Sequence, residues 1–389
     1  MNTLSDSGVM TAATPWYLLP ATVRFDRNVY CLLGLPFDAV NMNAAVQIVR
    51  RAVAQRTACF ISTPNLNFLI GCLTDRQFRQ SVINSDLSIA DGMPLVWIAR
   101  FLDIPIRERV PGAGLFEALR NNVMHPLSVY FFGGPDGAAA TACRRLNGES
   151  SGVHCTGFES PGFGSIEDLS SEATIAAINA SNADFLLVAL GAKKGQAWIE
   201  HNRSRISVPV ISHLGAVVNF VAGTLQRAPP WMQRAGLEWL WRIKEEPGLW
   251  RRYYSDGSAF IRLLATRVIP NYRFIQRHTP KKQELGAAAI VVRESADEMV
   301  ISLSGAWTRE NLGPLRNCLA RVVIAGMDLR VDLEHVVYVD AAFLGLMLVL
   351  HKHQNQHGRS LLCSPLNSQV HKIFVFGCCE FLLDVSAPP

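Results

Sequence analysis

The sequence has 389 residues, 49% hydrophobic and 18% charged, so it can bury a core for two or three domains and wholesale disorder is excluded. We expect no membrane-spanning helix and no secretory signal, since no apolar run nears the roughly 18 residues needed and the start lacks a basic-then-apolar block. The net charge of +5 is uneven: residues 227–282 carry 12 Lys/Arg and 4 Asp/Glu, a balance of +8 that leaves −3 elsewhere and predicts an anionic ligand or surface.

The first part of the chain alternates short apolar strands with helices. Residues 1–28 form a lead-in with little periodicity, and a domain at 29–226 follows. Short buried strands separated by helices are typical of an α/β fold with a doubly wound, largely parallel, Rossmann-like sheet. The predicted strands are 59–62, 87–90, 127–132, 185–190 and 208–212, and the predicted helices are 44–55, 94–102, 137–146 and 166–179.

The texture changes at residue 227, where a basic, Trp-rich appendage begins and runs to residue 275. Helices are predicted at 231–245 and 247–268. The second should end at Pro270, because proline inside a helix removes a backbone N–H. Residues 276–286 are polar and basic, which is typical of a linker.

A second small α/β domain is predicted at 287–389. Strands at 290–292 and 299–303 should pair, and a helix, a strand and a long helix follow them. A last strand and helix complete the domain. These later elements are predicted at 311–325, 328–332, 341–356, 361–362 and 369–376.

The nine cysteines form no CxxC pair and no repeating frame. Such a pattern is more typical of free thiols in a reducing cytoplasm than of a disulfide framework or a zinc site. We therefore expect a cytoplasmic protein without a bound metal.

Polar residues follow two of the predicted strands, where open α/β sheets bind ligands. Thr63 and Asn65 come after the first strand, and Asp91-Gly92 after the second. A carboxylate at such an edge is a candidate general base for a sugar hydroxyl. Helix capping is the alternative for all of them, because Thr, Asn and Asp are also common cap residues.

Two further clusters are suited to phosphate. The guanidinium of Arg109 can donate two parallel hydrogen bonds to phosphate oxygens, although a solvated surface pair is the alternative. Gly133-Gly134 stand between a strand and a helix, where glycines let a phosphate approach the helix start. This glycine pair matches no established nucleotide-binding motif.

The appendage combines tryptophan with arginine. Basic amphipathic helices rich in Trp bind membrane interfaces, whereas nucleic acid and ordinary packing are the alternative explanations. Nucleic acid is disfavoured, because the basic excess is confined to one amphipathic segment. The tryptophans proposed for the membrane are Trp231, Trp239, Trp241 and Trp250, and the candidate anion-binding arginines are Arg227, Arg242, Arg251 and Arg252.

Taken in order, these clusters resemble the WecG/TagA/CpsF family of bacterial glycosyltransferases over roughly residues 29–255. The matching segments are Thr63-Pro64-Asn65, residues 90–97, residues 108–112, Gly191 with Trp198-Ile199, Gly215-Ala216 with Phe220 and Gly223, residues 227–233, residues 237–242, Glu246-Pro247 and residues 250–253.

The resemblance implies inverting transfer, without a metal or other cofactor, from a UDP-sugar to a sugar on a polyprenyl diphosphate. It implies that Asp91 is the general base and that the donor pocket includes Thr63, Asn65 and Arg109. It further implies that the appendage closes the site, brings arginines to the diphosphate and reaches the inner face of the bacterial cell membrane. The donor-binding residues that we assign are Thr63, Asn65, Gly92, Arg109, Gly133, Gly134 and Gln196.

One departure from the family pattern concerns the donor. Family members usually read Gly-x-Pro-Lys-Gln-Glu, whereas this chain reads Gly191-Ala192-Lys193-Lys194-Gly195-Gln196. The family's Gln-Glu pair is thus replaced by Gly195-Gln196. A second departure is Gly248 after Glu246-Pro247, where arginine is frequent. The alternative function is therefore a catalytically impaired scaffold or regulatory subunit of a glycan assembly complex.

The last domain resembles an STAS domain, the anti-sigma-factor-antagonist fold. Residues 331–333 and 337–340, with the helix from Ala341, carry that likeness. Many STAS domains have Asp-Ser-Ser-Gly at this turn, with a serine that is phosphorylated, whereas this chain has Asp340-Ala341-Ala342-Phe343. We therefore expect the domain to bind a protein partner or a second copy of the chain rather than to act as a phosphorylation switch.

Overall fold

The computed structural model describes residues 25–383, so most of the predicted lead-in lies outside the described residues. Within the described residues, the chain forms two compact units. The first unit comprises residues 39–100 and 105–261. The second comprises residues 25–38, 101–104 and 262–383.

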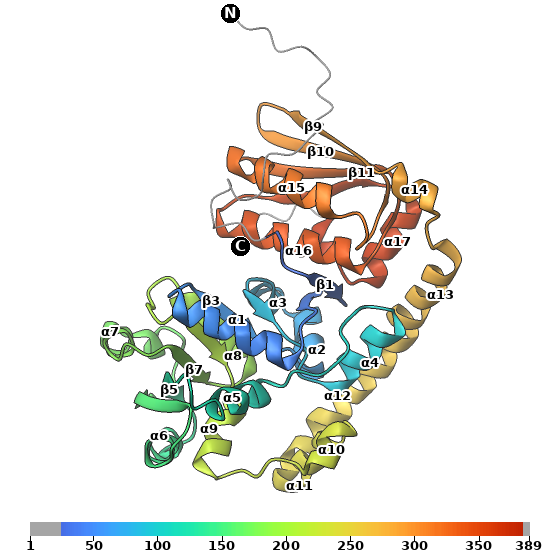
Figure 1. The fold of residues 1–389 in the computed structure, drawn as a ribbon. Coiled ribbons are helices and arrows are strands. Elements are labelled where there is room, and N and C mark those ends of the chain that lie inside the picture. The colour runs from blue at the N-terminus through green and yellow to red at the C-terminus, as the bar shows by residue number, and fades with distance from the viewer. Residues whose placement is uncertain (1–24, 384–389) are drawn as a thin grey trace, which may run out of the picture. The chain divides into compact units, whose positions relative to one another are not determined.

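The first unit is built on a six-stranded sheet in the order β4-β3-β8-β7-β5-β6, and every pairing in it is parallel. A doubly wound sheet was predicted and is confirmed (Figure 1). The edge strand β6 was not predicted, because polar side chains interrupt its apolar pattern. The strands are β3 (Cys59–Ser62), β4 (Leu87–Ser88), β5 (Leu127–Gly133), β6 (Val153–Glu159), β7 (Phe185–Ala189) and β8 (Val210–His213).

Helices cover both faces of this sheet. Along β5, Val129 and Phe131 join one apolar cluster and Tyr130 and Phe132 join the other, because successive side chains of a strand point to opposite faces. The first cluster includes residues of α1, α5, α6 and α9, and the second includes residues of α7 and α8. The helices are α1 (Met42–Ala54), α2 (Leu66–Thr74), α3 (Arg76–Ile83), α4 (Met93–Phe101), α5 (Gly112–Arg120), α6 (Ala138–Gly148), α7 (Glu172–Ala180), α8 (Ala192–Asn202) and α9 (Gly215–Ala222).

The appendage is helical but divided differently from the prediction. Its first predicted helix is two helices, α10 (Pro230–Arg234) and α11 (Glu238–Glu245). Gly236 separates them with φ +73°, a left-handed conformation that suits glycine.

The predicted end at Pro270 is wrong. The chain continues from α12 (Trp250–Leu263) through a π-helical turn, Leu264–Val268, into α13 (Ile269–His278). Pro270 lies in the first turn of α13, where its missing N–H is tolerated. A short helix, α14 (Lys282–Gly286), occupies much of the predicted linker.

The second unit has a four-stranded sheet in the order β12-β11-β10-β9. Strand β9 pairs antiparallel with β10, and the remaining pairs are parallel. The small α/β domain is therefore confirmed. Its elements are β9 (Ala289–Glu294), β10 (Glu298–Trp307), α15 (Gly313–Val322), β11 (Asp328–Val339), α16 (Ala341–Gln356), β12 (Leu361–Leu366) and α17 (Ser368–Phe376).

A hairpin from the start of the described chain belongs to this second unit. Strands β1 (Val29–Leu32) and β2 (Leu35–Asp38) pair antiparallel and pack on α16. Gly345 allows the close approach, because a Cβ there would lie 2.4 Å from the carbonyl oxygen of Val29. This hairpin was predicted to belong to the first domain, at residues 29–226.

The cysteines depart from the expectation of free thiols at one place. Cys143 of α6 and Cys155 of β6 form a disulfide. The other seven cysteines are buried thiols. Cys143 and Cys155 are on neighbouring elements of the first unit, so pairing needed only the α6–β6 contact, which spacing alone did not reveal.

Candidate active site

A cavity of about 730 Å³ opens at the carboxyl ends of the parallel strands in the first unit. Residues that follow five strands line it: Asp91 after β4, Thr63 after β3, Leu214 after β8, Gly191 after β7 and Gly134 after β5. Residues from α11 and α12 complete the lining. The appendage thus covers the edge of the sheet where such folds bind ligands.

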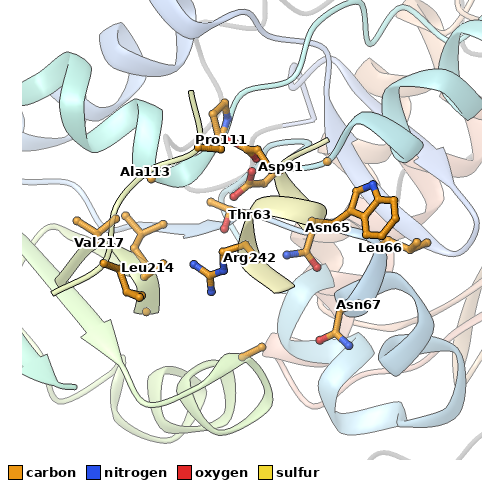
Figure 2. Close-up of a pocket in the computed structure, with 18 of the residues that line it drawn as sticks. Thr63, Asn65, Leu66, Asn67, Asp91, Pro111, Ala113, Leu214, Val217 and Arg242 are labelled. Carbon is orange, nitrogen blue, oxygen red and sulfur yellow. The ribbon is translucent and has the colours of Figure 1, made fainter. Parts of the chain in front are cut away.

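Asp91 lines this cavity, and Figure 2 shows its side chain among the lining residues. Its Oδ2 accepts a 3.2 Å hydrogen bond from the N–H of Gly112. Burial raises the pKa of Asp91 to about 7, although the Arg109 guanidinium and the Gly112 N–H both act to lower it. A carboxyl group that titrates near neutral pH is suited to accept a proton from a substrate hydroxyl.

Gly112 is required by close packing at the start of α5. A Cβ on it would lie 2.3 Å from Cδ2 of Leu214 and 3.1 Å from Cγ2 of Thr63. Any side chain would push α5 away from these two strand ends. Glycine here therefore brings the N–H that contacts Asp91 into place.

Asn65 serves as a helix cap and also lines the cavity. Its Oδ1 accepts a 3.1 Å hydrogen bond from the N–H of Phe68 at the start of α2. The capping alternative therefore holds for Asn65 without removing it from the site. Asn67, two residues further along the chain, donates through Nδ2 to Oδ2 of Asp256 at 3.2 Å, which links α2 to α12.

The partly buried ion pair of Arg109 and Glu238 connects the appendage to the loop before α5. Nη2 of Arg109 donates to Oε1 of Glu238 at 3.1 Å, and Nη1 donates to Oε2. The Arg109 side chain is only 11% exposed. A two-point contact of this kind fixes both side chains, so Glu238 holds α11 over the cavity.

Three of the four arginines assigned to an anion line the cavity: Arg227, Arg242 and Arg252. Arg251 does not, and its guanidinium lies 5.6 Å from the centre of the Trp250 ring. Figure 2 shows the Arg242 side chain among the residues around the cavity. Arg242 also pairs with Glu246 at 3.6 Å. Guanidinium groups that line one space still favour an anionic ligand such as a diphosphate.

The assigned donor-binding residues divide as well. Thr63, Asn65, Gly92, Arg109 and Gly134 line the cavity, whereas Gly133 and Gln196 do not. Gln196 is fully buried, and its Nε2 donates to the Ser62 hydroxyl at 3.2 Å.

The four tryptophans have two different surroundings. Trp231 and Trp250 are 59% and 53% exposed and lie outside the cavity lining. Trp239 and Trp241 line the cavity, and Nε1 of Trp241 donates to the carbonyl of Gln226 at 3.1 Å. Trp239 is also 43% exposed, so three of the four tryptophans have a large exposed area.

Sequence reasoning missed His213, Glu238 and Asp256, all of which line the cavity. A polar residue ending a buried apolar strand was the available signal for His213. Glu238 and Asp256 are on the appendage, and their roles depend on contacts with distant residues. Among residues 25–383, no three His, Cys, Asp or Glu side chains cluster as a metal site would require. In the same range, no helix has the length and apolarity to cross a membrane.

Comparison with known proteins gives two domain matches. The model of the glycosyl transferase WecG/TagA/CpsF family matches residues 30–273, and that of the MlaB-type STAS domain matches residues 290–377. Among curated proteins, N-acetylglucosaminyldiphosphoundecaprenol N-acetyl-beta-D-mannosaminyltransferases are similar. The enzyme of Bacillus spizizenii is 26% identical over 52% of this chain and 77% of its own, and that of Bacillus subtilis is 23% identical over 57% and 86%. A Staphylococcus aureus enzyme is 24% identical over 57% and 85%.

Proposed function

Because the chain belongs to the WecG/TagA/CpsF family of glycosyl transferases, we propose that it transfers N-acetylmannosamine from a UDP donor to a polyprenyl-diphosphate-linked N-acetylglucosamine. The names of its relatives support the sugar and the acceptor. The observation that carries the proposal is one cavity that contains both Asp91, with its raised pKa, and three arginines.

The proposed reaction is a single displacement. Asp91 takes the proton of the acceptor hydroxyl, whose oxygen bonds to the anomeric carbon as the bond from that carbon to UDP breaks. Attack opposite the leaving group inverts the anomeric centre. The rate advantage of such a base is typically about 10²–10⁴-fold.

Arginines take the charge that develops on the departing diphosphate. Arg227, Arg242 and Arg252 face the cavity, and fixed cations in a closed site stabilise such charge more than water does. No metal ion is invoked in this mechanism. Arg109 has a different part, because its guanidinium is engaged by Glu238 and so positions α11.

The appendage is also proposed to bind the inner face of the cell membrane, where a lipid-linked acceptor would be found. Its exposed apolar residues are accompanied by arginines, which suits an anionic lipid surface. Those residues are Trp231, Trp239, Leu240, Trp250, Tyr254, Ile261 and Ile269. The membrane test replaces Trp231 and Trp250 with serine and measures sedimentation with anionic vesicles. Phe163→Ser, which alters a fully exposed aromatic residue outside the appendage, is the matched control. Unchanged sedimentation of the double variant would contradict the membrane role.

The second candidate function is a scaffold or regulatory subunit. Gly195 in place of the family's glutamine favours it, as does the attached STAS domain, whose turn has no hydroxyl at Ala341-Ala342. In that case the second unit binds a protein partner or a second copy, and the first unit binds the nucleotide sugar without transferring it.

The deciding experiment measures transfer of labelled sugar from a panel of UDP-sugars to a short-chain polyprenyl-diphosphate N-acetylglucosamine, with lipid present. Transfer by the wild type and not by Asp91→Asn supports the enzyme and its base. Saturable donor binding by folded wild type, with no transfer to any acceptor, would replace this proposal with the scaffold.

A further inference from the structure

His213 ends β8 and lines the cavity, yet the mechanism above gives it no task. The residue is only 8% exposed, and its Nε2 has no hydrogen-bond partner. Asn219, on the helix α9 that follows this strand, also lines the cavity, and its buried Oδ1 atom has no hydrogen-bond partner either. Both residues line the cavity, and buried polar atoms are normally paired, so two such atoms without a partner favour a ligand as the missing partner.

The His213 ring occupies space that a side chain at position 195 would need. A Cβ on Gly195 would lie 2.2 Å from Cδ2 of His213 and 3.2 Å from Nε2. The glycine, where the family pattern has glutamine, is therefore the condition for this ring position. The neighbouring Gln196 is turned away into its contact with Ser62.

We propose that His213 binds the sugar donor, through a hydrogen bond from its neutral imidazole to an uncharged hydroxyl or amide of the nucleotide sugar. This inference rests on the proposed transferase function and adds the residue that reads the donor from the β8 wall. The side chain proposed to contact the donor is thus on β8, next to Gly195, the position at which the family pattern has glutamine.

The protonation state of His213 favours an uncharged group of the ligand as its hydrogen-bond partner. Burial lowers the pKa of His213 to about 4, so the ring is neutral at physiological pH. A neutral imidazole has one ring nitrogen that donates and one that accepts. The diphosphate has the arginines as partners, which leaves the nucleoside and the sugar for His213.

The test uses titration calorimetry of the full chain with UDP and with UDP-N-acetylmannosamine. His213→Phe keeps a ring of similar shape and removes both nitrogens, so we expect about tenfold weaker binding of the donor, as for one lost hydrogen bond. His213→Gln restores a neutral hydrogen-bonding group and should recover most of the affinity. Equal unfolding temperatures of the three proteins show that folding is unchanged.

The two ligands distinguish the source of the bond. An equal loss for UDP and UDP-N-acetylmannosamine assigns it to the nucleoside, and a loss for the sugar nucleotide alone assigns it to the sugar. A further variant, His213→Gly with Gly195→Gln, puts the side chain back at position 195 and should bind within a few-fold of wild type. If that double variant and His213→Gln both bind as weakly as His213→Phe, the inference is wrong.

Failure of the inference is separable from failure of the proposed function. Wild-type affinity in His213→Phe would overturn the role of His213 and leave the transferase standing. Absence of binding to either nucleotide by folded wild type would overturn both.

Discussion

Each unit has an aspartate between a parallel strand and a helix. Asp91 follows β4 and precedes α4, and Asp340 follows β11 and caps α16. Asp340 accepts three backbone hydrogen bonds, at 2.8 Å from Arg309 and at 2.9 Å from both Ala342 and Phe343. The carboxylate of Asp91 accepts one, from Gly112, and stands beside a cavity.

Burial raises the pKa of both carboxyl groups, so the shift alone does not separate them. What differs is how the oxygens are used. Asp340 uses its oxygens to accept the backbone N–H groups of Arg309, Ala342 and Phe343, whereas Asp91 accepts one such bond and so retains the acceptor capacity that the proposed proton transfer requires. The same placement in the chain thus supports a cap in one unit and a proposed base in the other.

Asp91→Asn should have the largest effect. We expect the transfer rate to fall by about 10²–10⁴-fold, because the amide cannot accept the proton. The unfolding temperature should not fall, since the change removes a charge that burial disfavours. Labelled-sugar transfer and thermal unfolding measure the two. Asp340→Asn is the matched control and should keep wild-type turnover. Near-normal transfer by Asp91→Asn would contradict the assignment of Asp91 as the general base.

Asp340→Ala tests the structural role of the second aspartate. It should lower the free energy of unfolding of the second unit by about 1–2 kcal/mol, because α16 loses its cap and Arg309 loses an acceptor. Hydrogen exchange along α16 would report the loss. Full protection of α16 in the variant would show that Asp340 is not the cap that its contacts describe.

The pH profile should distinguish the two carboxyl groups without mutation. A raised pKa means that Asp91 is protonated below about pH 7, and a protonated base is inactive. The transfer rate should therefore fall about tenfold per unit as the pH drops below 7, and level off above it. A rate that stays constant from pH 5.5 to 8 is the opposing result.

The smallest expected effect concerns the link between α2 and α12. Asn67→Ala removes the part-buried hydrogen bond to Asp256 and should lower the free energy of unfolding by about 0.5–1.5 kcal/mol, the net worth of one such bond. Transfer should slow only a few-fold, through displacement of α12. Chemical unfolding and steady-state rates would measure both, and a loss as large as that of Asp91→Asn would place Asn67 in the chemistry itself.

The sequence alone predicted the bounds of those strands and helices that depend on neighbouring residues in the chain. The buried strand at 59–62 and the helix at 341–356 match the structure residue for residue, because apolar pattern and capping determine their bounds. Asp91 was identified in the same way, from its position after a strand. Features that depend on distant partners were out of reach.

Three particulars show that limit. Gln196 was assigned to the donor because of its place in a motif. Its side chain instead contacts Ser62 on β3, and Gln196 does not line the cavity. His213 became a candidate only when the space beside Gly195 was known. Pro270 was read as a stop, yet a π-helical turn before it lets the helix continue.

The hairpin of β1 and β2 also bears on how the protein is made. Its side chains Val29, Leu32, Leu35 and Phe37 are at most 1% exposed, and α16 covers the hairpin. Roughly 300 residues separate it from that helix, so at 5–20 residues per second a ribosome needs about 15–60 s to deliver the cover. Throughout that interval the apolar side chains of the hairpin are exposed to solvent, so we expect chaperones to bind the nascent chain. For the same reason, a truncation that keeps the transferase segment and drops the second domain should aggregate unless the hairpin is removed with it.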